Sequence, residues 1–184
     1  MGVNSGEKML LSVGELSKRK NHEVVIKSIN KLNRERRIDT VKYFVAGDGD
    51  LQEYLSNLIE DSHLQDKVFL LGYRTDVNML TKAADVFVLP SRQEGLSVAL
   101  MEAMATGLPV LCSKIRGNTD LVRNEYNGFT YKVDDVDGFS AGIEKIIHTS
   151  YKIGANNLIS VKKYDEAVVK NIMKNVYTNI LKEN

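Results

Sequence analysis

The sequence has few of the features that mark membrane-spanning or disulfide-bonded proteins. It has one cysteine, Cys112, and two prolines, and its apolar runs are short. A lone cysteine excludes an internal disulfide, and a membrane helix needs roughly twenty consecutive apolar residues. The N-terminus also lacks a charged segment followed by an apolar secretory core. We therefore expect a cytoplasmic protein, with Cys112 as a buried thiol at a strand end.

Net charge is almost absent too. The chain has 25 Lys and Arg against 24 Asp and Glu, and the basic residues are scattered. Nucleic-acid binding normally needs a basic stripe or patch, so we expect no nucleic-acid partner. At 184 residues, 43% of them hydrophobic, the chain has the size of one globular domain that can bury a core.

Short apolar runs alternate with segments of helical spacing. Five runs are typical of buried strands and a sixth is weaker; they lie at 9–13, 41–46, 68–71, 86–89, 110–112 and 128–133. This order predicts an α/β fold, a Rossmann-like doubly wound parallel sheet with helices on both faces. In such a sheet, ligands bind at the carboxyl ends of the strands.

Two helices are predicted near the C-terminus, at 139–148 and 165–181. In the second, Val169, Ile172, Val176 and Ile180 share one face. We expect these side chains to face inward, so that the helix packs back on the domain or on a partner domain.

The segment 85–112 carries the chemistry. It predicts a strand, a polar loop, a helix opened by Gly95, a glycine stop and another strand. The amides of Gly95, Leu96 and Ser97, at the start of that helix, could hold a diphosphate. Glu102 follows Gly95 by seven residues, which on one helix is nearly the same face about 10 Å further along. Its carboxylate could then accept hydrogen bonds from ribose hydroxyls, although a solvated helix acid is the simpler interpretation of this residue alone.

The glutamates of EGLSVALMEAMATGLPV resemble a known signature. Glu94 and Glu102, with seven residues between them, are similar to the E-x7-E motif of the large retaining GT-B family called glycosyl transferases group 1. Four further segments resemble motifs of that family and occur in the expected order: SVGELSKRKNH, AGDGDLQEYL, LLGYRTDV and RGNTDLVRNEYNGFTY. The resemblance spans nearly the whole chain. It implies that residues 1–184 are the C-terminal, donor-binding half of a GT-B enzyme of the bacterial exopolysaccharide or capsule type, without the N-terminal acceptor domain.

The resemblance also implies roles for individual residues. Glu94 would contact the donor sugar and, with Lys20, form the catalytic set. The remaining donor contacts would come from the phosphate-loop residue Gly14, from the amides of Gly95, Leu96 and Ser97, from Glu102 at the ribose, and from Tyr73 and Arg74 at the base.

One position departs from the family pattern. Glu15 stands where many relatives have an arginine that acts as a second phosphate cation. The diphosphate charge would then rest more heavily on Lys20, with Lys18 or Arg19 as substitutes.

The implied activity is transfer of a sugar from a nucleotide donor, with UDP favoured, to a hydroxyl of a saccharide or lipid-linked saccharide acceptor, with retention. No metal or other cofactor is expected. The sequence Asp48-Gly49-Asp50 matches the metal-binding D-x-D motif of another glycosyltransferase architecture, but we interpret it as a tight turn with Asp50 as a helix cap.

Two alternatives remain open, a nucleotide-sugar epimerase on the same fold and a non-catalytic nucleotide-sensing module. Any membrane association, at the inner face, would reside mainly in the absent half.

Overall fold

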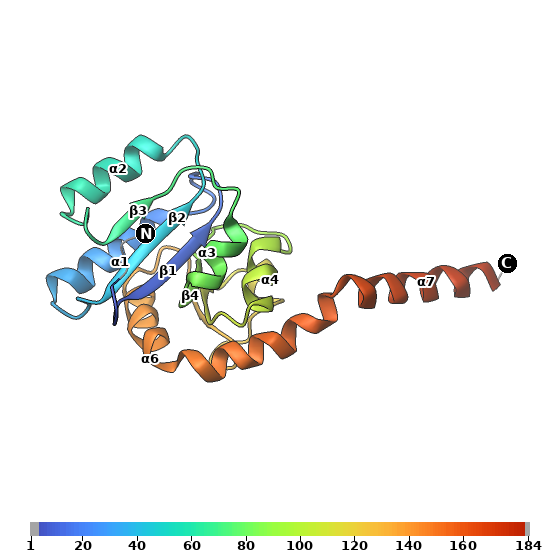
Figure 1. The fold of residues 1–184 in the computed structure, drawn as a ribbon. Coiled ribbons are helices and arrows are strands. Elements are labelled where there is room, and N and C mark those ends of the chain that lie inside the picture. The colour runs from blue at the N-terminus through green and yellow to red at the C-terminus, as the bar shows by residue number, and fades with distance from the viewer. Residues whose placement is uncertain (1–3, 183–184) are drawn as a thin grey trace.

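A computed structural model describes residues 4–182, apart from the side chains of 149–151 and 182, and its centre is a six-stranded parallel sheet (Figure 1). The strand order is β3-β2-β1-β4-β5-β6. The bounds are β1 Lys8–Val13, β2 Val41–Ala46, β3 Val68–Leu70, β4 Val86–Leu89, β5 Val110–Ser113 and β6 Phe129–Tyr131. All six predicted strands are confirmed to within two residues, and so is the Rossmann-like fold class.

Helices cover both faces because alternate residues of each strand point to opposite sides. On one face, α1 (His22–Arg34), α2 (Gln52–Asp61) and α6 (Val136–Val161) bury a large cluster that includes Leu10, Tyr43 and Phe139. On the other, α3 (Val77–Ala83) packs over β1 and β2, and α4 (Val98–Ala105) packs over β4 and β5. Cys112 is fully buried on the α4 side, as predicted.

Helix α6 is much longer than the predicted 139–148 because its second half crosses the turn between α4 and β5. A Cβ on Gly154 would lie 2.1 Å from the carbonyl oxygen of Gly107, so the two backbones touch. The Asn157 amide donates to the Leu108 carbonyl at 2.6 Å. These contacts bring the end of α6 over to the α4 face.

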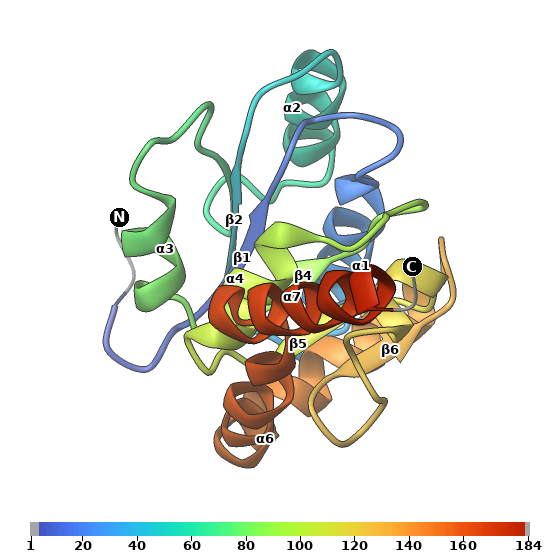
Figure 2. The ribbon, with the colours of Figure 1, turned by 90° about the vertical axis from the view of Figure 1, so that its right-hand side faces the viewer.

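The last helix, α7 (Glu166–Lys182), projects away from the domain after the short helix η1 (Lys162–Tyr164) (Figures 1 and 2). The predicted inward-facing side chains are 43–55% exposed: Val169, Ile172, Val176 and Ile180. The prediction that they face the interior of this domain was therefore wrong. Helical spacing defines an apolar face but does not say what covers it.

In residues 4–182, no helix combines the length and apolar character that crossing a bilayer requires.

Candidate functional site

The loops that follow β1 and β4 meet at the point where the strand order reverses. The chain continues from β1 to β2 on one side of the sheet and from β4 to β5 on the other, and open parallel sheets bind ligands at such a point. Hydrogen bonds join the loops: the Arg92 amide donates to the Arg19 carbonyl at 2.8 Å, and Asn21 Nδ2 donates to the Pro90 carbonyl at 3.1 Å. A ligand site at the carboxyl ends of the strands was predicted at this place.

Lys20 and Glu94 form an ion pair that joins the loop after β1 to the loop after β4. Lys20 Nζ lies 2.7 Å from Glu94 Oε1, and the two side chains are 12% and 8% exposed. Gly14 makes room for the lysine, since a Cβ on Gly14 would lie 3.0 Å from Lys20 Cε. The structure therefore brings together Gly14, Lys20 and Glu94, three residues that the sequence singled out.

Arg19 is a second cation beside Glu94. Its Nη1 lies 3.5 Å from Glu94 Oε2, its Nη2 lies 4.0 Å from a carboxylate oxygen of Glu15, and its side chain is 47% exposed. Lys18 meets the site differently, through its main-chain carbonyl, which accepts from Arg92 Nε at 3.1 Å. Of the two substitutes considered for the missing arginine, the geometry favours Arg19.

Helix α4 begins later than predicted. It starts at Val98, and Ser97 caps it by accepting a hydrogen bond from the Leu100 amide at 3.4 Å. Gly95 and Leu96 therefore lie in an exposed loop rather than in the first turn. Serine has the better capping side chain and here has extended backbone angles. The geometric argument that put Glu102 seven helical residues beyond Gly95 was wrong in this respect, since only the part from Val98 onward is helical.

Glu102 lies on the exposed face of α4. It lines a groove of about 650 Å³ whose walls come from α4, the end of α6 and η1: Val98, Met101, Ala105, Leu158, Val161, Lys162, Tyr164 and Asp165. On the opposite side of α4, Leu100, Ala103 and Met104 are buried against the sheet. Glu102 thus lies on the exposed surface of α4, the helix that follows the loop after β4.

Tyr73 and Arg74 lie in the loop after β3. Tyr73 is 75% exposed. The Arg74 guanidinium forms a two-pronged pair with Asp76, with Nε and Nη2 at 2.8 and 2.6 Å from the two carboxylate oxygens. This pair holds the Arg74 side chain on its own loop in the absence of a ligand.

Gly47 and Gly49, which were predicted to form a tight turn, instead let the segment after β2 touch the backbone of the loop after β1. A Cβ on Gly47 would lie 2.0 Å from the Gly14 carbonyl oxygen, and one on Gly49 would lie 2.7 Å from the Leu16 carbonyl oxygen. Asp50 does not cap α2, whose N-cap position is Leu51. Within residues 4–182, no three His, Cys, Asp or Glu side chains gather as metal ligands would.

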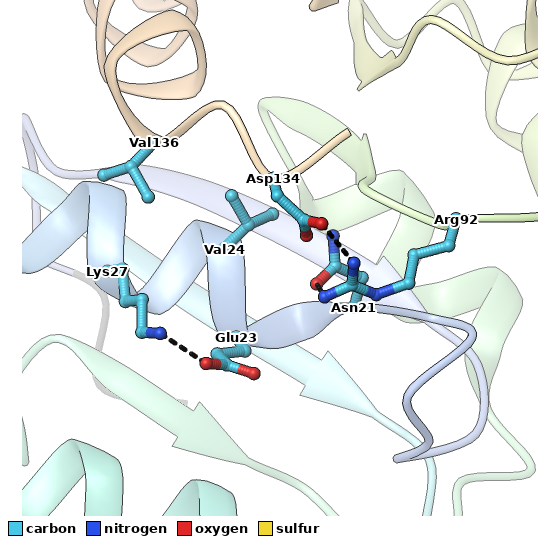
Figure 3. A pocket seen from close by; sticks show the side chains of 7 residues that line it. All are labelled: Asn21, Glu23, Val24, Lys27, Arg92, Asp134 and Val136. Atoms are coloured by element: carbon cyan, nitrogen blue, oxygen red, sulfur yellow. Dashed lines mark hydrogen bonds and ion pairs between the residues drawn. The ribbon is translucent and has the colours of Figure 1, made fainter. Parts of the chain in front are cut away.

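Arg92, which was not among the residues singled out from the sequence, joins three loops. Its guanidinium donates to Asn21 Oδ1 at 3.0 Å and pairs with Asp134 (Figure 3). Its Nε donates to the Lys18 carbonyl. Asn21 has a left-handed backbone with φ of 57°, a conformation that asparagine tolerates better than most residues. A small cavity of about 130 Å³ beside them is lined by Asn21, Glu23, Val24, Lys27, Arg92, Asp134 and Val136. The loops after β1, β4 and β6 are thus fixed relative to one another.

His22, at the start of α1, is buried under the loop after β1. Its Nε2 lies 3.2 Å from the Glu15 carbonyl, and its Nδ1 lies 3.2 Å from the Tyr43 hydroxyl, which in turn contacts Ser12 Oγ at 2.8 Å. Because a carbonyl only accepts, the bond to Glu15 requires the proton on Nε2. Burial lowers the pKa of His22 from 6.5 to about 4, so the imidazole is neutral at pH 7.

A family model described as glycosyl transferases group 1 matches residues 1–164. The chain is 32% identical over 176 residues to the UDP-Gal:alpha-D-GlcNAc-diphosphoundecaprenol alpha-1,3-galactosyltransferase of Escherichia coli, which covers 90% of this chain and 46% of that protein. It is 31% identical over 190 residues to an uncharacterized glycosyltransferase of Methanocaldococcus jannaschii, covering 100% of this chain and 45% of the relative. The chain therefore spans a little under half the length of these relatives.

Solved structures share the fold. HepE of Anabaena in complex with UDP has a TM-score of 0.84 at 23% identity, over 94% of this chain and 49% of that one. The C-terminal domain of a glycosyl transferase group 1 family protein (LpcC) from Francisella tularensis has a TM-score of 0.76 at 20% identity, over 88% of both chains.

Proposed function

Because the chain belongs to the glycosyl transferases group 1 family, we propose that it is the C-terminal, donor-binding domain of a retaining glycosyltransferase. The donor is a nucleotide sugar, with UDP as the favoured nucleotide, and it binds where the loops after β1 and β4 meet. The observation that carries this proposal is the nearly buried pair of Lys20 and Glu94 at that place. Removing two charges from water costs free energy, and the attraction between them often does not offset that cost. A nearly buried charge pair at this edge of the sheet is therefore a candidate for a functional role.

The chemistry follows from the charges. When the bond between sugar and diphosphate breaks, negative charge grows on the departing phosphate oxygen. The Lys20 ammonium, together with Arg19, can take up that charge, and a charge-assisted hydrogen bond of this kind is worth about 1.5–3 kcal/mol. Glu94, released in part from Lys20, can accept hydrogen bonds from the sugar hydroxyls. The two cations can stabilise the leaving group without a metal ion, and we propose that the reaction is metal-independent.

Transfer to an acceptor needs a second domain. GT-B enzymes close a cleft between two domains, and this chain spans 46% and 45% of the two relatives named above. We propose that the acceptor, a saccharide or lipid-linked saccharide, binds the other half, and that the exposed apolar face of α7 packs there. The isolated domain should then bind donor with little or no sugar transfer, because the reacting groups are not held together.

The test is calorimetric titration of UDP, GDP, ADP and their sugars into the wild-type chain and the Glu102→Ala variant. We expect the UDP compounds to bind best and Glu102→Ala to weaken all nucleotides about tenfold, the effect of losing about 1.4 kcal/mol. Glu60→Ala, at an exposed position of α2, is the control and should bind as wild type does. Equal affinity for Glu102→Ala would remove Glu102 from the site.

A chelator arm addresses the metal. Excess EDTA should leave UDP binding unchanged. If EDTA abolished binding, a divalent ion held by Asp48 and Asp50 would become the better explanation.

A further inference from the structure

The Glu94 carboxylate is held from inside the protein by a buried serine. Ser91 Oγ donates to Glu94 Oε1 at 2.7 Å, the same oxygen that receives Lys20, and Ser91 is fully buried. The carbonyl of Ser91 accepts from the hydroxyl of Ser113, the last residue of β5. The orientation of Glu94 thus depends on a serine whose backbone is fixed by the neighbouring strand.

Asn118, in the short helix α5 (Arg116–Thr119), fixes Ser113 in turn. Its Nδ2 donates to the Ser113 carbonyl at 2.9 Å and to Ser113 Oγ at 3.2 Å. Asn118 is fully buried, and its Oδ1 has no hydrogen-bond partner within the described chain. A buried acceptor without a partner destabilises the folded state. Such groups are found where a protein needs a particular side-chain geometry at the expense of stability.

Gly117 brings α5 into direct contact with the backbone of Glu94. A Cβ on Gly117 would lie 1.9 Å from the Gly95 carbonyl oxygen and 2.6 Å from the Glu94 carbonyl oxygen. No rotamer change can relieve such a contact because both partners are backbone. Any larger residue at this position must therefore push the loop around Glu94 and Gly95 away from α5.

We propose that Ser91, Ser113, Gly117 and Asn118 form a clamp that positions Glu94 against Lys20 and so sets the contact with the donor sugar. The last part of this statement rests on the proposed function; the positioning of Glu94 does not. None of the four clamp residues needs to touch the donor. Lys20 holds Glu94 from the side of β1, and the clamp holds it from the side of β5.

The principal variant is Gly117→Ala, and Thr119→Ala is its control in the same helix. Thr119 is exposed, and its hydroxyl bonds only to carbonyls of its own turn, those of Ile115 and Arg116. If Glu94 contacts the sugar, Gly117→Ala should lower the preference for UDP-sugar over UDP about tenfold, while the affinity for UDP itself changes less than about twofold. Thr119→Ala should change neither.

A Glu94→Gln background separates positioning from general damage. In that background, Gly117→Ala should have little further effect on the preference for UDP-sugar, because its effect acts through the lost carboxylate. An equal loss in both backgrounds would overturn the clamp. Ser91→Ala, which removes only a hydroxyl, gives the same comparison if Gly117→Ala does not fold.

A measurement without ligand keeps the clamp testable if no nucleotide binds. With ¹³C-labelled glutamate, the side-chain carboxyl resonance of Glu94 can be assigned by its absence in Glu94→Gln. The clamp predicts that Gly117→Ala and Ser91→Ala shift this resonance and that Thr119→Ala does not. An unmoved resonance overturns the clamp, whereas a shifted resonance in a chain that binds no nucleotide retains the clamp and refutes the proposed function.

Discussion

Acid should destabilise this domain through His22. The native state keeps the imidazole neutral, because burial lowers its pKa from 6.5 to about 4, with the nearby Lys20 charge acting in the same direction. The unfolded chain has the ordinary pKa and binds a proton first. The stabilisation is therefore complete above pH 6.5 and is lost as the pH falls from 6.5 to about 4. A difference of about 2.5 pKa units corresponds to roughly 3 kcal/mol, a large part of the stability of a domain of this size.

The assay is urea unfolding of the wild-type chain and of His22→Gln between pH 7.5 and 4. Glutamine can still donate to the Glu15 carbonyl but does not titrate, so the variant should lose roughly 3 kcal/mol less than the wild type over this range. Tyr43→Phe is the control, because it removes the hydroxyl that His22 contacts and keeps the imidazole. It should lower stability at every pH and retain the wild-type slope. If the difference between wild type and His22→Gln were constant with pH, the buried neutral histidine would be refuted.

Three further outcomes follow from burial. Cys112 should resist alkylation in the native chain and react fully in denaturant, because the thiol is fully buried and burial raises its pKa. Mass spectrometry measures the labelling, and rapid labelling of the native chain would contradict the place of Cys112 in β5. Truncation after Tyr164, which removes α7, should change the free energy of unfolding by less than about 1 kcal/mol, because the large apolar side chains of α7 are 41–77% exposed. A larger loss in calorimetry would mean that α7 packs on the domain. Glu94→Ala should cost about 3 kcal/mol, since it removes the carboxylate that pairs with the nearly buried Lys20. Lys20→Ala should cost less, because Arg19 stays within 3.5 Å of Glu94. Urea unfolding should show that the double variant costs less than the sum, and additivity would argue against the pair.

The sheet was predictable because its four central strands, β2, β1, β4 and β5, are buried on both faces and are therefore mostly apolar runs. The edge strands β3 and β6 are only partly buried. The pairing of Lys20 with Glu94 was predictable only through the family motif, since the two residues are 74 positions apart. The start of α4 was misjudged because glycine and serine are both plausible N-terminal signals, and the choice between Gly95 and Ser97 depends on how the loop leaves β4. The sequence alone did not reveal the role of α5. A single turn has no apolar period, and the importance of Gly117 comes from a backbone contact with a segment more than twenty residues away.

Glu15 adds a negative charge to the proposed donor site, where many relatives have an arginine. The loop after β1 contributes Lys18, Arg19 and Lys20, and the site carboxylates are those of Glu15 and Glu94, so three positive and two negative charges leave a single positive charge. The Glu15 side chain is 58% exposed, however, and its nearest cation is Arg19 at 4.0 Å. Its contribution to the fold lies in the carbonyl that faces His22. Water screens the exposed carboxylate more effectively than the nearly buried Lys20. At the position where the family pattern has a phosphate cation, this chain thus has an exposed glutamate whose main-chain carbonyl contacts His22. We propose that Arg19, four residues along the loop, serves as the second phosphate cation instead.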